Sequence, residues 1–302
     1  MMSLVRAHYT LALLTLSYLL GEMGHFLLGA TSRAMAQELE FGEEGCLCGD
    51  QLEEEECQAA GCEWDYTGRG MEYQLLAGPT FILVFSVSGV IFGLAADYVN
   101  RMRLLGGAVS LFSSAILLTS VSTSYWELVL ARMLLAAGES ACSPVCVSLI
   151  SDLYPDRHRG LATAVLHLGV YLGFGLSQAA GIYLTELDLL GFSWRAPYFL
   201  TGAPGLLTGV LLLLLQDPRT RKEEEGKCSS DELLTVKEEQ EEVPPVSSWS
   251  GDLLCLKETL LTPYMVIMFL AAAARHSAGF TWAYNCRLYF LRSVSAQLTV
   301  GG

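Results

Sequence analysis

The sequence predicts an all-α membrane protein, and two observations carry this prediction. Hydrophobic residues make up 52% of the 302 residues, and the mean hydropathy is +0.40. These residues gather in separate apolar runs, and a bilayer core takes about 20 helical residues to cross. Because a backbone in lipid must satisfy its own hydrogen bonds, each run is expected to be a helix. No strand signal of weight accompanies the runs.

Seven transmembrane helices are predicted along the chain. The first apolar run has no small-residue cleavage site and carries Glu22 and His25, so it is interpreted as a span rather than a signal peptide. Pro144 is expected to kink the fourth span or to open a backbone carbonyl there. The predicted spans are residues 8–30, 74–96, 104–123, 126–151, 161–184, 196–215 and 262–284.

Small residues at four-residue steps are expected to let two of these helices pack closely against their neighbours. They are Gly89 and Gly93 in the second span, and Gly169, Gly173, Ser177 and Gly181 in the fifth.

The charge pattern divides the chain into three parts. Residues 1–216 are predicted to form a six-helix bundle, in which the loop 31–73 carries twelve acids and two arginines, a net charge of −10. Residues 217–261 are predicted to form a cytoplasmic linker that is largely disordered, because it is rich in charge and poor in apolar residues. Residues 262–302 are predicted to hold the seventh helix and the truncated start of a second half. This acidity excludes a nucleic-acid surface, which would be basic.

The short connections set the orientation, because cytoplasmic loops are enriched in lysine and arginine. We therefore expect the N-terminus and the loop after the second span to be cytoplasmic, and the loop 31–73 to be extracytosolic. The arginines on the predicted cytoplasmic side are Arg6, Arg101, Arg103, Arg157 and Arg159, and those opposite are Arg195, Arg287 and Arg292, with Arg33 and Arg69 in the acidic loop.

The acidic loop also holds four cysteines, Cys46, Cys48, Cys57 and Cys62. An even set in an oxidising compartment predicts disulfides, for which three pairings are possible. A zinc site is the alternative, but the spacing is not that of a zinc site and the loop has no histidine. We therefore predict disulfides and no metal.

A short polar stretch, GLAADYVNRMR, joins the second and third spans. Gly93, Asp97 and Arg101 resemble the loop motif of the major facilitator superfamily, Gly-x-x-x-Asp-Arg/Lys-x-x-Arg, and Asn100 beside Arg101 resembles its spinster-type variant. Tyr98 stands where the family often has Arg or Lys. Asp97 and Arg101 could pair across one helical turn. The resemblance implies that Asp97 latches two halves of a transporter on the cytoplasmic side, with Arg101 holding it in place.

A second block, residues 130–141 followed by Ser143-Pro144 and residues 151–153, is similar to the fourth helix of spinster-type lipid transporters. Together the two resemblances imply the N-terminal six-helix bundle of the major facilitator superfamily plus one helix of the second half. In that fold the site lies between the halves.

Ionisable residues inside predicted spans are candidates for function, because charges in a bilayer are costly. Glu22 and His25 share a face of the first span, and Arg132 and Glu139 share a face of the fourth. We expect Glu22 near His25 to be the proton site and Arg132–Glu139 to be a structural or gating pair. Further candidates are Arg275 and His276 in the seventh span.

The resemblance implies a secondary active transporter of amphiphilic or organic, lipid-like solutes, working by alternating access and coupled to protons. Its expected partners are membrane lipids, a small amphiphilic substrate, H⁺ and a second half or full-length protomer. It implies a multi-pass protein of the plasma membrane or of a lysosomal or endosomal membrane.

No cofactor is expected, and no enzyme motif is found. The alternatives are an inactive or regulatory truncated form and, less in keeping with the charge pattern, a seven-helix receptor. The receptor reading rests on the helix count and on Asp156-Arg157-His158, which follows the fourth span rather than the third.

Overall fold

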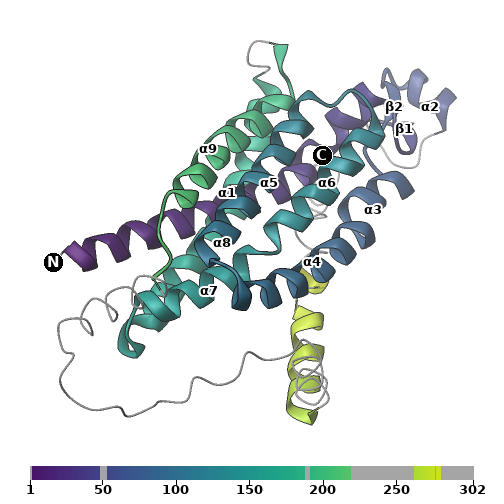
Figure 1. Cartoon of the computed structure of the whole chain (residues 1–302). Helices are drawn as coiled ribbons and strands as arrows, with labels where there is room; N and C mark the ends of the chain where they lie inside the picture. Colours follow the sequence, from purple (N-terminus) through teal and green to yellow (C-terminus); the bar gives the residue numbers. More distant parts are fainter. Residues whose placement is uncertain (1, 48–52, 188–190, 219–261, 276, 280–302) are drawn as a thin grey trace, which may run out of the picture. The chain divides into compact units, whose positions relative to one another are not determined.

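The computed structural model describes residues 2–47, 53–187, 191–218, 262–275 and 277–279. It divides into two compact units, Met1–Glu224 and Glu225–Gly302. The first unit is a bundle of long helices (Figure 1). In the second, residues 263–275 and 277–279 are helical, within the predicted seventh span. His276 and residues 280–284 of that span lie outside the described residues, and Arg275 is exposed.

Six helical spans in the described part of the chain are long and apolar enough to cross a membrane. They confirm the first six predicted spans, although α1 continues to Leu39, nine residues beyond the predicted end. The helices of the bundle are α1 (Met2–Leu39), α3 (Met71–Ala77), α4 (Pro79–Tyr98), α5 (Arg101–Val121), α6 (Tyr125–Glu139), α7 (Cys142–Leu153), α8 (Asp156–Glu186) and α9 (Arg195–Leu213).

Two of the spans are broken, each at a proline. The second divides into α3 and α4 at Gly78, and Pro79 begins α4. The fourth divides into α6 and α7 at Ser140 and Ala141, and Pro144 lies in the first turn of α7. A proline has no N–H to give to the carbonyl four residues earlier, so it is tolerated at the start of a helix and interrupts a longer one. The expected kink at Pro144 is confirmed.

The bundle is held together by two groups of helices. α5 packs against α9 and α6, and α1 packs against α8 and α9 (Figure 1). The contact of α1 with α8 uses the predicted small residues. A Cβ atom on Gly169 would lie 2.7 Å from the Thr15 carbonyl oxygen, and one on Gly173 would lie 2.5 Å from that of Leu19. The backbones of the two helices therefore touch where no side chain intervenes.

Replacing Gly173 with alanine is expected to lower stability by about 1–3 kcal/mol, because the added methyl overpacks the contact with α1. Gly175 is the matched control, since its Cβ would meet nothing within 4 Å. Gly175→Ala should be neutral or slightly stabilising, because alanine is the better helix former. Thermal unfolding in detergent measures both; equal midpoints for the two variants would contradict the close contact.

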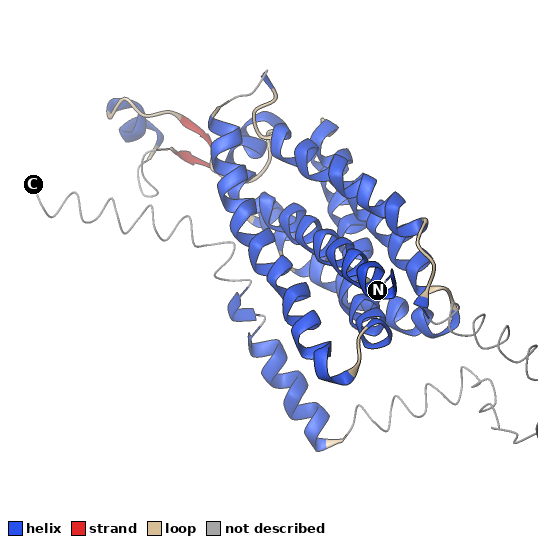
Figure 2. Ribbon diagram, turned by 90° about the vertical axis from the view of Figure 1, so that its left-hand side faces the viewer, coloured by secondary structure: helices blue, strands red, loops and turns tan. Residues whose placement is uncertain are grey.

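The connection between the first two spans is a small folded subdomain, which we call the cap (residues 40–70). It contains the strands β1 (Glu44–Cys46) and β2 (Trp64–Tyr66), paired antiparallel, with the short helix α2 (Glu54–Ala59) between them. Figure 2 shows the two strands beyond one end of the bundle. The sequence signalled no strands, because segments of three residues are too short to show a period of two.

The cap is covalently stapled, as its cysteines predicted. Cys46 in β1 is bonded to Cys57 in α2, and Cys62 is also in a disulfide. Cys48 lies outside the described residues. Sulfurs that are committed to disulfides are not thiolates, so they do not supply zinc ligands.

Candidate functional site

Two buried polar groups stand out in the bundle, one at its centre and one at the end opposite the cap. The central group consists of Glu22 and His25, one turn apart on α1, and Glu139 at the end of α6; we call it the acid–imidazole cluster. His25 Nδ1 lies 3.0 Å from Glu139 Oε2. One potential ligand atom from each residue lies within 4.8 Å of the others. His25 and Glu139 are 3% and 2% exposed, and Glu22 is half-buried.

The surroundings of the cluster are apolar and close-fitting. The His25 ring stacks on Phe26 with centroids 4.5 Å apart and lies 4.3 Å from the ring of Phe81. Gly21, one residue before Glu22, leaves space for the Glu139 carboxylate, which would lie 3.6 Å from a Cβ at that position. Little water reaches a pair in such a setting, so its charge interactions are stronger than they would be at the surface.

Arg132 lies two turns before Glu139 on α6 and is 5% exposed. Its Nη1 donates to the backbone carbonyl of His25 at 3.0 Å, and its Nε to that of Leu76 at 3.3 Å. The guanidinium also lies over the Phe81 ring, 4.6 Å from the centroid. The sequence predicts an Arg132–Glu139 pair and a separate Glu22–His25 pair. The structure pairs these residues differently, because the acid bonded to His25 is Glu139.

Among the described residues, these three donors form the only group that could share one cation. Two carboxylates and one imidazole can also share a proton, and such coupled groups titrate together rather than singly. The arrangement is therefore chemically suited to taking up and releasing a positive charge.

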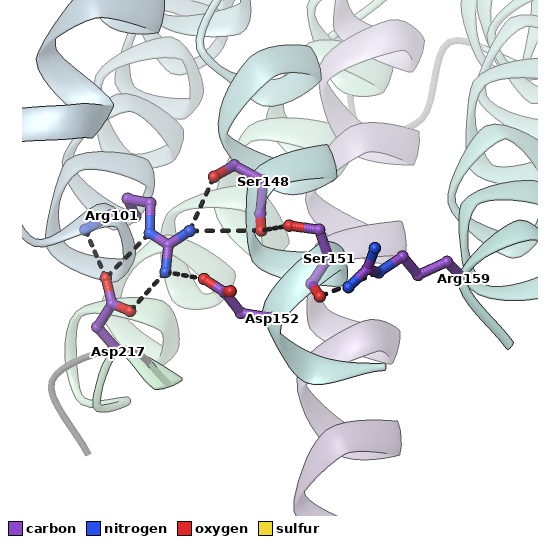
Figure 3. Close-up of polar contacts among 6 residues, drawn as sticks. All are labelled: Arg101, Ser148, Ser151, Asp152, Arg159 and Asp217. Carbon is purple, nitrogen blue, oxygen red and sulfur yellow. Dashed lines mark hydrogen bonds and ion pairs between the residues drawn. The ribbon is translucent and has the colours of Figure 1, made fainter. Parts of the chain in front are cut away.

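The second polar group is centred on Arg101, the first residue of α5 (Figure 3). Its Nη2 lies 3.0 Å from Asp217 Oδ1 and 2.5 Å from Asp152 Oδ2. Its Nη1 donates to Ser148 Oγ at 2.8 Å, and its backbone N–H to Asp217 Oδ2 at 2.9 Å. We call these four residues the Arg101 network. It joins the start of α5 to the end of α7 and to the residues after α9.

Local sequence explains why α5 begins here. The Asn100 side chain caps the helix by accepting from the Arg103 N–H at 3.0 Å. The carboxylate of Asp217 lies at the same helix N-terminus, where a negative charge is favourable.

The predicted Asp97–Arg101 pair is wrong. α4 ends at Tyr98 and α5 begins at Arg101, so the two residues lie on different helices. Asp97 is exposed and makes no ion pair with any residue that the structure describes. Gly93 lies against α7, where a Cβ would be 4.0 Å from that of Pro144.

Sequence reasoning missed the two acids that bind Arg101. Asp152 lies in the block 151–153 that carries the family resemblance, and Asp217 is the first residue of the predicted linker. An acid directly after an apolar run and before a proline, as in Asp217-Pro218, is the signal that could have marked it. Asp217 is only 3% exposed, so it belongs to the bundle.

A neighbouring contact closes the end of α7. Arg159 Nε donates to the carbonyl of Ser151 at 3.1 Å (Figure 3). It also donates to the carbonyl of Tyr154 at 3.2 Å. Cations near a helix C-terminus satisfy its last carbonyls. The bundle thus combines membrane-spanning helices, a charged cluster buried between them and a braced helix end. These features are typical of a multi-pass integral membrane protein with a functional polar site between its helices.

The chain belongs to the Major Facilitator Superfamily, whose sequence profile matches residues 9–292. This membership overturns the seven-helix receptor alternative. It agrees with the expectation that the protein is not an enzyme, since two of the relatives below are named as transporters.

The relatives match only part of the chain. The chain is 33% identical over 136 residues to the sphingosine-1-phosphate transporter SPNS2 of Danio rerio. This match covers 44% of this chain and 26% of that protein. The chain is 28% identical over 138 residues to Protein spinster of Drosophila melanogaster, covering 46% and 22%. It is 28% identical over 178 residues to the 3-(3-hydroxy-phenyl)propionate transporter of Escherichia coli, covering 59% and 42%. The matched region is therefore less than half of each relative.

A solved structure shares the fold. The bacterial homolog of the human lysosomal transporter Spinster, in an inward-facing and unoccupied conformation, superposes with a TM-score of 0.55 at 23% identity. The match covers 70% of this chain and 43% of that one.

Proposed function

We propose that this bundle is part of a secondary active transporter that carries an amphiphilic, lipid-like solute by alternating access and is coupled to protons. The observation that carries the proposal is the acid–imidazole cluster, buried between α1 and α6 of a Major Facilitator Superfamily bundle.

Proton coupling is supported by the chemistry of the cluster. A coupled carrier needs a group that holds a proton in one state and releases it in another, and imidazoles and carboxylates are such groups. Glu22 is the member with partial exposure, so it is the one through which a proton can enter or leave. His25 and Glu139 are buried behind it and can share the charge.

An amphiphilic substrate is supported by the side chains that surround the cluster. Charged and aromatic side chains alternate around it, with Phe81 touching both His25 and Arg132, and Phe26 lying 4.9 Å from the Phe174 ring on α8. A ligand with a polar head and an apolar body matches this mixture of charged and aromatic groups. The relatives named above include a transporter of a lipid phosphate and one of an aromatic acid.

Asp97 remains our proposed cytoplasmic latch to a second half. The Arg101 network braces its own helix ends and leaves Asp97 exposed, available to a partner. Asp97→Asn is expected to shift the carrier toward inward-open states and to slow turnover at near-normal expression. Cysteine accessibility on the two membrane faces measures the shift, with the exposed Asp156→Asn as control. Unchanged accessibility and rate would leave the motif as a topology signal only.

The transport proposal is tested by reconstitution into proteoliposomes. The 302-residue chain is reconstituted alone and after co-expression with the C-terminal six helices of a spinster-type relative. Uptake of a labelled lysolipid that accumulates only with an imposed pH gradient supports the proposal. If neither preparation takes up solute while the complete relative does, the inactive or regulatory alternative replaces it.

A further inference from the structure

The break between α3 and α4 leaves a short helix that is attached to the bundle at few points. α3 has seven residues and ends at Ala77, directly before Gly78-Pro79. The last carbonyls of a helix lack partners within it, and Leu76 is the last residue but one of α3. Its carbonyl accepts from Arg132 of α6. A cation at a helix C-terminus is favourable, so Arg132 acts as a cap for α3.

Arg132 is at the same time part of the surroundings of the acid–imidazole cluster. It binds the backbone carbonyl of His25, whose ring binds Glu139. It is the charged neighbour of both His25 and Glu139. Glu139 Oε1 is buried and has no hydrogen-bond partner among the described residues. An alternative acceptor for the guanidinium therefore lies close to the carbonyls that it now holds.

The two sets of acceptors differ in how they respond to protons. A carbonyl has a fixed dipole, whereas a carboxylate gains a full charge when it ionises, and charge-assisted hydrogen bonds are roughly twice as strong as neutral ones. The charged and titratable groups around Arg132 are His25 from α1 and Glu139 from its own helix, and Glu22 lies beside these two on α1. Tyr18 from α1 and Cys142 from α7 also face the two carboxylates. α4 presents the Phe81 ring, and α3 its backbone.

We propose that Arg132 is a positioning residue that couples the charge of the acid–imidazole cluster to the docking of α3. With Glu22 and Glu139 protonated, Arg132 holds the Leu76 carbonyl and α3 stays docked. When they ionise, Arg132 turns to the carboxylates, and α3 is released at the cap end of the bundle. This coupling deepens the transport proposal, and its role in the protein rests on that proposal. The release of α3 can nevertheless be measured without any transport.

The test is hydrogen exchange of the α3 amides, followed by mass spectrometry on the full chain in lipid nanodiscs. After correction for intrinsic rates, protection of residues 71–77 in the wild type should fall about tenfold between roughly pH 5 and pH 9, the size expected for losing a hydrogen bond to a charged donor. α9 serves as the internal reference. Protection of α3 that is flat with pH would overturn the proposal, and this arm needs no variant.

Substitutions then assign the effect to Arg132. Arg132→Gln should leave α3 unprotected at every pH, and Arg132→Lys should restore part of the protection. Glu22→Gln with Glu139→Gln should keep α3 protected at every pH. Arg103→Gln, an exposed arginine elsewhere in the bundle, is the matched control. Wild-type behaviour in Arg132→Gln would overturn the assignment. Protection that tracks pH in a chain that transports nothing would uphold the coupling and refute the transport proposal alone.

Discussion

Replacing Arg101 with methionine is expected to cost about 3–5 kcal/mol of stability, the range for removing one partner of a buried ion pair. Arg101 is 2% exposed and is the common partner of Asp152 and Asp217. Without it, Asp217 would lose its charged partner and remain as a buried carboxylate at the α5 N-terminus. Methionine fills much of the same volume, so the loss reports charge rather than a cavity.

The free energy of unfolding is measured in increasing denaturant on the protein purified in detergent, with Arg103→Met as the control. Arg103 is two residues away on the same helix and is exposed, so its loss should change stability by less than about 0.5 kcal/mol. Adding Asp217→Asn to Arg101→Met should recover part of the loss, because it removes the stranded charge. Equal stability for the two arginine variants would show that the Arg101 network does not brace the bundle.

Replacing Glu22 with glutamine is expected to abolish accumulation driven by a pH gradient while leaving solute exchange intact. Glutamine resembles the protonated acid in size and hydrogen bonding but cannot release a proton. Placing a charge at the centre of a membrane helix costs roughly 2.5–3.5 kcal/mol on insertion scales, so a residue with no use for its charge would be readily replaced by an apolar one. The half-buried position of Glu22, beside the His25–Glu139 pair, fits that use.

Uptake into proteoliposomes with and without a gradient separates the two activities. Glu127→Gln is the matched control, because Glu127 is an exposed acid near the start of α6. Full gradient-driven uptake by Glu22→Gln would move the coupling role to Glu139 or His276. Glu139→Gln is expected to impair gating as well, since His25 would lose a buried charged partner.

Local pattern was enough to predict the helices, because length and hydropathy decide what crosses a bilayer. The same pattern placed Glu22 and Glu139 on polar faces and foresaw the close packing at Gly169 and Gly173. It could not tell which acid would meet His25, because that depends on how α1 and α6 approach each other. Spacing alone suggested a partner for Arg101 one turn away, whereas the actual partners lie on other helices.

The helix breaks also show what can and what cannot be predicted from sequence. Pro144 signals its own break, because the missing N–H is visible in the residue type. The acceptor role of the Leu76 carbonyl is invisible in sequence, because every residue has a carbonyl and only the fold brings Arg132 to this one.

The length of α1 has a practical consequence. Its 38 residues make a helix of roughly 57 Å, against a hydrocarbon core of about 30 Å, so it projects well beyond the lipid. The cap is fastened along this projection: a Cβ on Gly68 would lie 2.7 Å from the Arg33 amide nitrogen, and Gln37 Nε2 donates to Asp65 at 2.9 Å. An antibody fragment raised against the stapled cap would therefore grip a rigid extension of α1. Such a fragment offers a fiducial mark for imaging the bundle.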